Sequence, residues 1–134
     1  MAYMSQDRKN KIAPKVKALL KKYRLKGSLS VRHNTTLVLT IRAGAIDFIG
    51  NYNETVSQRY PDQNRRAVNY IDVNTYYCDK YFSGVASDAL CELIAAMNDG
   101  NHDNSDAMTD YFDVGWYVDV HVGKWDKPYI HEAI

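Results

Sequence analysis

The chain has 134 residues, of which 46% are hydrophobic and 25% charged, and its formal net charge is only +1. This length and composition are typical of one globular domain, expected over residues 1–134, and they exclude a disordered or fibrous chain. No apolar run is long enough to span a bilayer and the first eleven residues are too polar for a secretory signal, so we expect a cytoplasmic protein with no membrane partner.

The first predicted element is a basic helix at about residues 5–24. Ser5 can cap this helix, and Pro14 either kinks it or begins a second segment. Gly27 is expected to end the helix in a left-handed cap conformation. The apolar residues recur at the spacing of one helical face: Ile12, Val16, Leu19, Leu20 and Tyr23.

Two strands joined by a hairpin are predicted next, at about 28–32 and 36–42, because apolar and polar residues alternate there with a period of two. A further apolar piece, 45–49, is expected to extend this meander as a third strand. The polar segment 51–66 shows no sustained period, so we expect a long surface loop there.

The second half of the chain adds a strand, a helix and the strand with the clearest alternation. These are predicted at about 67–76, 84–98 and 115–122. The order of elements favours an α+β fold. In it, a mainly antiparallel sheet of about four to five strands carries two amphipathic helices on one face.

The two cysteines, Cys78 and Cys91, lie thirteen positions apart without a C-x-x-C partner or a flanking pair of histidines. This spacing indicates neither a zinc site nor a redox motif, and burial as free thiols is the expectation. A cysteine nucleophile that the fold pairs with a histidine, and thus an unrecognised enzyme, is the alternative.

Other chemical motifs are weak. Asp99, Asn101, Asp103 and Asp110 match positions of a calcium loop, but Asn104 stands where that loop needs glycine, and a strand follows where a helix should. An ordinary polar turn is the better interpretation. The histidines and serines show none of the spacings of zinc proteases or serine hydrolases. We therefore expect no metal, no cofactor and no catalytic residues.

Charge is distributed unevenly along the chain. Residues 1–44 contain eleven Lys or Arg and one acid, whereas residues 81–123 contain eight acids and no Lys or Arg. Such asymmetry indicates an interaction surface. The first helix offers a phosphate-binding set, although a solvated helix face explains the same residues: Lys15, Lys17, Lys21, Lys22 and Arg24.

The acidic segment is the other candidate surface. Its carboxylates could mimic a phosphate backbone in a basic groove of a partner, with aromatic side chains as anchors. The alternative is that the acidic and basic halves neutralise each other within one molecule. The predicted partner-binding residues are Asp99, Asp103, Asp106, Asp110, Asp113, Trp116 and Tyr117.

Several segments resemble small proteins of bacteriophages and plasmids: MAYMSQ (1–6), SVRH (30–33), IDFIGNYN (46–53), TDYFDVGWYVD (109–119) and VGKWDKPY (122–129). Those proteins are similar to a large polyvalent protein-associated domain. The family has no established activity, so the resemblance implies no catalytic residue. What it implies is a mobile-element setting, in which compact proteins act by binding a host macromolecule.

Together these observations predict a non-enzymatic phage or mobile-element accessory protein that acts by macromolecular binding in the bacterial host cell. The resemblance favours an inhibitor of a bacterial defence complex of the CRISPR type, with a host or defence protein complex as partner of the acidic surface. A nucleic-acid-binding accessory protein that uses the basic first helix is the second hypothesis. An unrecognised enzyme is the third.

Overall fold

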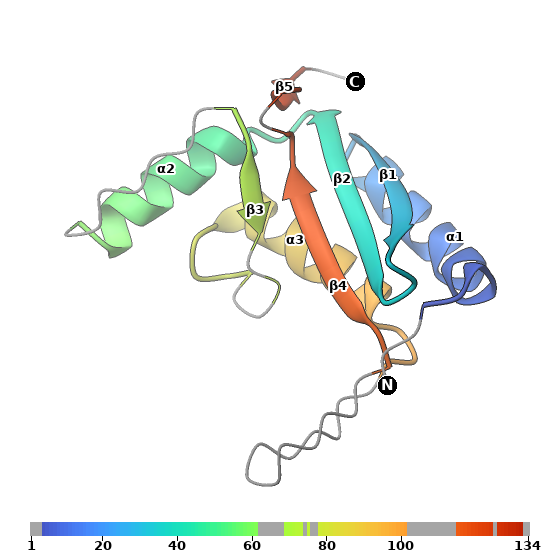
Figure 1. Ribbon diagram of the computed structural model, residues 1–134. Helices are drawn as coiled ribbons and strands as arrows, with labels where there is room; N and C mark the ends of the chain where they lie inside the picture. The colour runs from blue at the N-terminus through green and yellow to red at the C-terminus, as the bar shows by residue number, and fades with distance from the viewer. Residues whose placement is uncertain are drawn as a thin grey trace, which may run out of the picture.

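A computed structural model of the chain describes residues 4–61, 69–73, 75, 78–101, 115–124 and 126–132. Five strands form one mixed sheet, with three helices packed beside it (Figure 1). The predicted α+β class is therefore confirmed. In chain order the described elements are α1 (Gln6–Lys22), β1 (Leu25–Arg32), β2 (Thr36–Gly44), α2 (Phe48–Arg59), β3 (Ile71–Val73), α3 (Gly84–Met97), β4 (Tyr117–Val122) and β5 (Ile130–His131).

The strands lie in the order β1-β2-β4-β3, and β5 pairs with the end of β2. The pair β1–β2 is the predicted antiparallel hairpin, and β3–β4 is also antiparallel, so the sheet is mainly antiparallel as expected. The central pair β2–β4 is parallel, with Leu39 opposite Val120. A parallel pair requires a long crossover connection, and α2, β3 and α3 all lie within this one.

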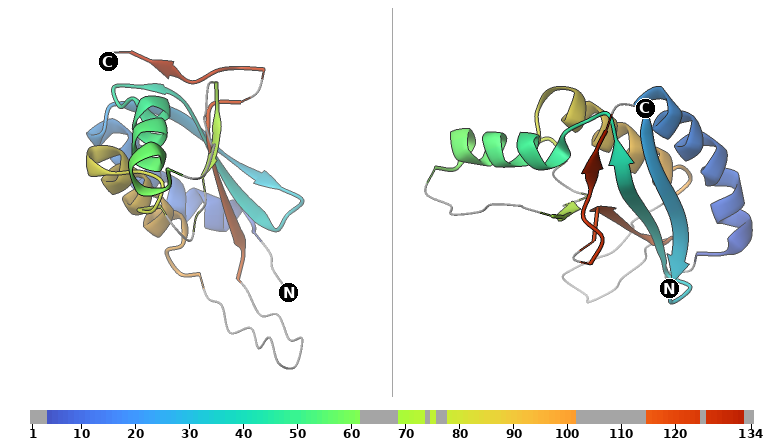
Figure 2. Two further views of the ribbon diagram at one scale, coloured as in Figure 1. Left: turned by 90° about the vertical axis from the view of Figure 1, so that its left-hand side faces the viewer. Right: turned by 90° about the horizontal axis from the view of Figure 1, so that it is seen from above.

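Helices α1 and α3 pack against each other and lie on the same side of the sheet (Figure 2), which agrees with the predicted two-helix layer. None of the described helices covers the opposite face. The core between the layers is apolar because each strand turns alternate side chains towards the helices. Its most buried members include Val16, Leu37, Leu39, Ile41, Leu90, Leu93, Met97, Val120 and Val122.

Helix α1 begins where the sequence predicted, directly after Ser5. The side chain of Ser5 accepts a hydrogen bond from the backbone N–H of Arg8 at 3.1 Å, which caps the first turn. Pro14 lies within one continuous helix rather than starting a second one. The buried face carries the predicted spacing: Ile12, Val16 and Leu20.

The end of α1 differs from the prediction at Gly27. The helix ends at Lys22, and Arg24 then takes a left-handed conformation with φ of 56°. Gly27 instead lies in β1, where the pairing with β2 shifts by one residue. A Cβ atom at Gly27 would lie 2.8 Å from the carbonyl oxygen of Thr40, so glycine lets the two strands approach at this irregularity.

The structure of residues 45–59 differs from two predictions. The expected strand at 45–49 and the expected loop at 51–66 are wrong, because α2 spans Phe48–Arg59; residues 62–66 lie outside the described part of the chain. Asp47 caps this helix by accepting a hydrogen bond from the backbone N–H of Gly50 at 2.9 Å. Only three of its residues are buried, so its apolar period was too weak to recognise: Phe48, Thr55 and Val56.

An aromatic cluster holds α2 against the rest of the molecule. The ring of Phe48 meets Phe82 and Tyr129 edge-on, with centroids 6.2 and 5.6 Å away. The Tyr129 hydroxyl donates to the carbonyl oxygen of Ile46 at 2.5 Å. Burial, with smaller contributions from nearby carboxylates, raises the pKa of Tyr129, so this hydroxyl stays a donor at any physiological pH.

The side-chain amide of Asn51 on α2 also forms hydrogen bonds with Ser83, the residue that precedes α3. Asn51 donates to the carbonyl oxygen of Ser83 at 3.1 Å and accepts from the backbone N–H of Ser83 at 2.9 Å. We expect Asn51→Ala to lower the free energy of unfolding by about 1–2 kcal/mol, because it leaves a part-buried donor unpaired. Urea denaturation measures this loss. Gln58→Ala, on the exposed side of α2, is the control, and equal losses in both variants would contradict the assignment.

The remaining elements lie near their predicted positions. The strands predicted at 28–32, 36–42 and 115–122 are β1, β2 and β4, and the helix predicted at 84–98 is α3. The strand predicted at 67–76 is the shorter β3, Ile71–Val73; residues 67, 68, 74 and 76 are not described. In the described parts of the chain, no helix combines the length and apolarity that crossing a bilayer requires.

The prediction of two free thiols is wrong, because Cys78 and Cys91 form a disulfide. The bond ties the segment before α3 to the second turn of that helix, with the two Cα atoms 5.5 Å apart. A disulfide sulfur is not a thiolate, so the cysteine-enzyme hypothesis would need the reduced form of the protein. Sequence spacing alone could not show that the chain turns back at this point.

Candidate functional site

The predicted acidic surface is only partly visible. Asp103, Asp106, Asp110 and Asp113 lie outside the described residues. Trp116 is 4% exposed, and its indole N–H donates to the carbonyl oxygen of Met97 at 3.0 Å, so it is a core residue and offers no exposed anchor.

The two remaining members of that surface differ. Asp99 forms an ion pair with Lys15 of α1. Tyr117, at the start of β4, is 48% exposed and is the one predicted aromatic anchor that the structure presents to solvent. The described part of the acidic surface thus amounts to one paired carboxylate and one tyrosine.

The acidic and basic halves meet within the molecule. Three ion pairs join the N-terminal half to the acidic segment, and a fourth joins β1 to the residue after β5: Lys15–Asp99, Lys22–Glu92, Arg32–Asp119 and Lys26–Glu132. All of these side chains are about half exposed, so each pair contributes little to stability. Their effect is on charge distribution, because they neutralise several acids, whereas other cations have no ion-pair partner in the described part of the chain.

Four exposed cations at the end of α1 and on β2 have no carboxylate within ion-pair distance among the described residues: Lys17, Lys21, Arg24 and Arg42. They surround an open cavity of about 530 Å³ with no acid in its lining, which we call the basic pocket. Its full lining is Lys17, Leu20, Lys21, Arg24, Leu25, Lys26, Gly27 and Arg42.

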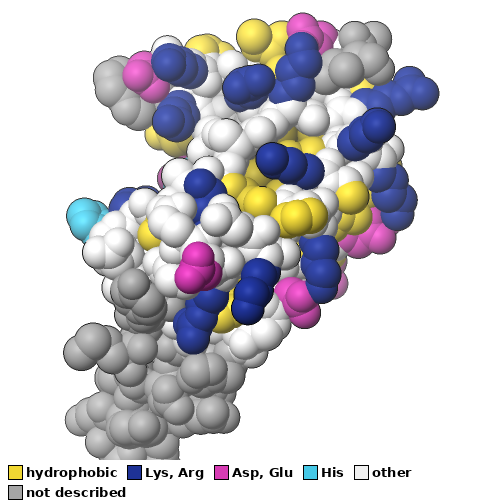
Figure 3. Space-filling view, turned by 90° about the vertical axis from the view of Figure 1, so that its right-hand side faces the viewer, with side chains coloured by type: hydrophobic (Ala, Val, Ile, Leu, Met, Phe, Trp, Pro, Cys, Tyr) yellow, Lys and Arg dark blue, Asp and Glu magenta, His cyan; other side chains and the backbone are white. Residues whose placement is uncertain are grey.

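Three elements build the basic pocket. Lys17 and Lys21 are four residues apart, so they lie one turn apart on the same side of α1. Arg24 follows them through the left-handed turn into β1. Arg42 lies on β2 near the shifted pairing between β1 and β2. Figure 3 shows this side of the molecule, where Lys and Arg side chains surround a strip of hydrophobic ones.

The structure therefore divides the predicted phosphate-binding set. Lys17, Lys21 and Arg24 line the basic pocket, whereas Lys15 and Lys22 are held in ion pairs. Sequence reasoning missed Arg42, because only the pairing of β1 with β2 brings it beside α1. A smaller hollow of about 230 Å³, lined in part by Lys11, contains Asp99 and is less suited to an anion.

Beside the pocket, α1 is fixed to α3 by a polar cluster. The hydroxyl of Tyr23 donates to the carboxylate of Glu92, and Lys22 Nζ lies 3.4 Å from the same carboxylate. The hydrogen bond from Tyr23 is the largest cause that lowers the pKa of Glu92, and burial opposes it. The bond to Glu92 likewise raises the pKa of Lys22 and that of Tyr23.

We expect Tyr23→Phe to raise the pKa of Glu92 towards its usual value of 4.5. A carboxyl whose pKa is lowered by folding stabilises the protein above the unfolded pKa, and this contribution is lost as pH falls through the folded pKa. The stability advantage of wild type over Tyr23→Phe should therefore begin to fall near the usual Glu pKa and be lost once the pH is below the lowered pKa of the folded protein. An NMR titration of the Glu92 carboxyl, with Tyr117→Phe as control, measures the shift; an unchanged Glu92 pKa would refute it.

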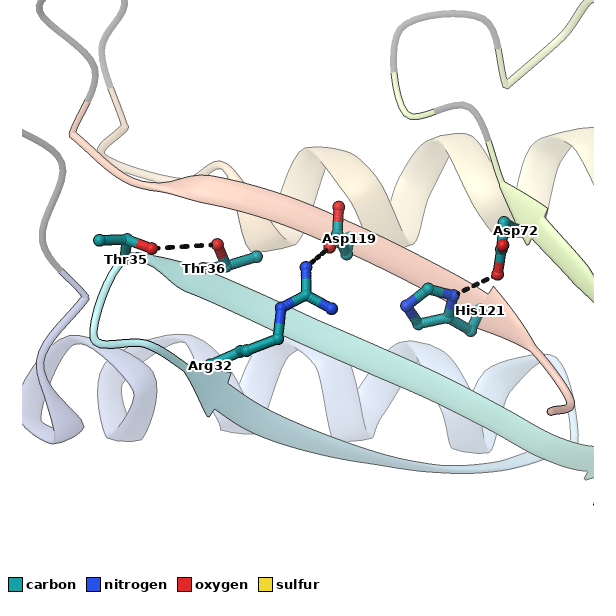
Figure 4. A network of polar contacts seen from close by, with 6 residues as sticks. All are labelled: Arg32, Thr35, Thr36, Asp72, Asp119 and His121. Atoms are coloured by element: carbon teal, nitrogen blue, oxygen red, sulfur yellow. Dashed lines mark hydrogen bonds and ion pairs between the residues drawn. The ribbon is translucent and has the colours of Figure 1, made fainter. Parts of the chain in front are cut away.

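The uncovered face of the sheet carries a second polar group of residues (Figure 4). Arg32 reaches across β2 to Asp119, and His121 Nδ1 lies 2.6 Å from Asp72 Oδ1 on the neighbouring strand. Within the described chain, no hydroxyl or thiol bonds to the other ring nitrogen of His121.

The described residues contain no candidate metal site. In those residues, no group of three or more His, Cys, Asp or Glu side chains could hold a metal ion. Asn101, part of the calcium-loop pattern, donates to the carbonyl oxygen of Trp116 and accepts from its backbone N–H at 3.0 Å. This amide thus joins the end of α3 to the start of β4.

The fold and the pocket define an α+β protein with a basic, acid-free cavity at the edge of a mixed sheet. Comparison with protein-family models, with curated proteins and with solved structures finds no match to this chain. The argument for function therefore depends on the site itself.

Proposed function

We propose that this protein is a non-enzymatic binding protein that holds nucleic acid through the basic pocket. The observation that carries the proposal is a cluster of four cations that have no ion-pair partner among the described residues and that line a cavity in which those residues place no acid. Phosphate backbones are the commonest polyanions in a cell, and Lys and Arg bind them by releasing condensed counterions. A formal net charge of +1 does not oppose this, because the positive potential is local.

A solvated helix face is the competing interpretation of the same lysines, and two features of the site argue against it. First, the cations come from α1, the following turn and β2, so they converge from separate elements rather than covering one helix. Second, they line one open, shallow cavity together with apolar residues. Convergent polar groups around a concave site are typical of ligand binding.

The salt dependence of binding tests the proposal. The logarithm of the association constant should fall with the logarithm of salt concentration by about 0.7 to 0.9 for each phosphate contact. Contacts from all four cations would give a slope of about −3 to −4 and a loss of roughly 100-fold between about 50 and 200 mM salt, and contacts from two would give about half that slope. Fluorescence anisotropy with labelled DNA and RNA measures this slope. Absence of binding at the lowest salt would refute the function.

The phage-type inhibitor of a defence complex stays a second proposal, set in the cytoplasm of a bacterial host. The described residues support it through Tyr117, an exposed aromatic at the start of β4 next to the acidic segment. A pull-down from bacterial lysate, with and without nuclease, separates the two proposals. A stoichiometric host protein that survives nuclease supports the inhibitor, whereas material lost on nuclease treatment supports nucleic-acid binding.

A further inference from the structure

The lining of the basic pocket is not purely cationic. Leu20 and Leu25, which are each 7% exposed, and Gly27 belong to the lining together with the exposed cations, so the apolar residues lie deeper than the charged ones. A site that meets only phosphates needs no apolar floor, because phosphates and riboses are polar. A ligand that fits both parts carries phosphates and also a flat apolar group, which is the composition of a nucleotide.

The cations themselves are of two kinds. Lys17 and Lys21 are compact charges that suit phosphate oxygens from any direction. Arg24 and Arg42 are planar guanidinium groups, which can also stack on the face of a base. The cavity of about 530 Å³ falls within the size range of small-ligand pockets and so has room for a base and its sugar.

Duplex nucleic acid cannot use this apolar floor. Its bases are stacked and paired inside the helix, so a duplex would present only phosphates and sugar edges to the pocket. A single strand can turn a base outwards, and proteins recognise single strands mainly through such unstacked bases.

We infer that the basic pocket binds single-stranded nucleic acid, with one base over the Leu20–Leu25 floor between Arg24 and Arg42 and the flanking phosphates on Lys17 and Lys21. This inference rests on the proposed function and narrows its ligand. Electrostatics alone would favour a duplex, because its charge density is higher. A preference for single strands would therefore show that contacts with an unstacked base contribute to the affinity.

Anisotropy titrations at one low salt concentration, with single strands and duplexes of equal length, test the inference. We expect single strands to bind at least about tenfold more tightly, a factor within the range measured for one stacked base. DNA and RNA strands of the same sequence are titrated separately, and the difference in affinity shows whether the site prefers deoxyribose or ribose. Duplex binding that is equal or tighter overturns the inference but leaves the proposed function intact. No binding in any arm removes both.

A charge-conserving variant tests the role of the two arginines. Arg24→Lys combined with Arg42→Lys keeps the charge but removes both planar groups, so we expect an unchanged salt slope and a roughly tenfold smaller preference for single strands. Arg32→Lys, on the uncovered face of the sheet, is the matched control and should change neither quantity. A double variant that keeps the full preference overturns the stacking role.

Discussion

We expect the triple variant Lys17→Glu, Lys21→Glu, Arg42→Glu to bind nucleic acid about 1,000-fold more weakly than wild type at about 50 mM salt. The lost phosphate contacts of Lys17 and Lys21 each remove roughly one released counterion, which is worth about tenfold in affinity at that salt concentration. Loss of the Arg42 guanidinium beside the base removes about a further tenfold. The salt slope should fall by about one to two, because two of the three side chains contact phosphates. All three side chains are exposed, so folding should be little affected, and circular dichroism can verify this.

The matched control is Lys11→Glu, Lys124→Glu, Lys127→Glu. It makes the same change in net charge with three exposed lysines that do not line the basic pocket. We expect this variant to lose far less affinity, since the local potential in the pocket is retained. If both variants lost affinity equally, binding would follow net charge and the pocket would not be the site.

The second large effect concerns the disulfide. We expect reduction of Cys78–Cys91, or their joint replacement by serine, to lower the free energy of unfolding by about 3 kcal/mol. The bond closes a loop with a sequence separation of 13, and in the chain-entropy account its stabilisation comes from restricting the unfolded chain. Urea denaturation with and without reductant measures the difference.

The double serine variant supplies the control for this experiment, because reductant should leave its urea midpoint unchanged. Neither cysteine lines the basic pocket, so its nucleic-acid affinity should equal that of wild type. Two titratable thiols in protein purified under oxidising conditions would contradict the disulfide. The bacterial cytoplasm keeps most thiols reduced, so trapping the thiols inside cells also tests the expected cytoplasmic location.

The elements that the sequence predicted well are those whose local period matches their burial. In α1, Val16 and Leu20 repeat at helical spacing, and in β4 Val120 and Val122 alternate with polar neighbours. Local patterns of this kind encode which face is buried. They contain no information about which strand lies beside which, so the parallel β2–β4 pairing could not be predicted.

Helix α2 and the basic pocket could not be predicted fully because both depend on contacts between residues far apart in the sequence. The segment around Asn51 reads as a loop because polar residues dominate it, and distant aromatic residues such as Phe82 and Tyr129 support its helical form. The basic helix was evident from its lysines, but Arg42 joins them only through strand pairing. Which lysines are matched by acids likewise depends on how α1 and α3 pack.

The left-handed turn at Arg24 has a consequence for anyone who engineers this chain. A non-glycine residue in that conformation costs about 1 kcal/mol, and glycine would adopt it freely. Arg24→Gly is therefore expected to raise the melting temperature, and a screen for thermostability alone would select it. On the inferred binding mode, that substitution would remove one of the two guanidinium groups beside the base, so Arg24 should be kept unchanged in such an experiment.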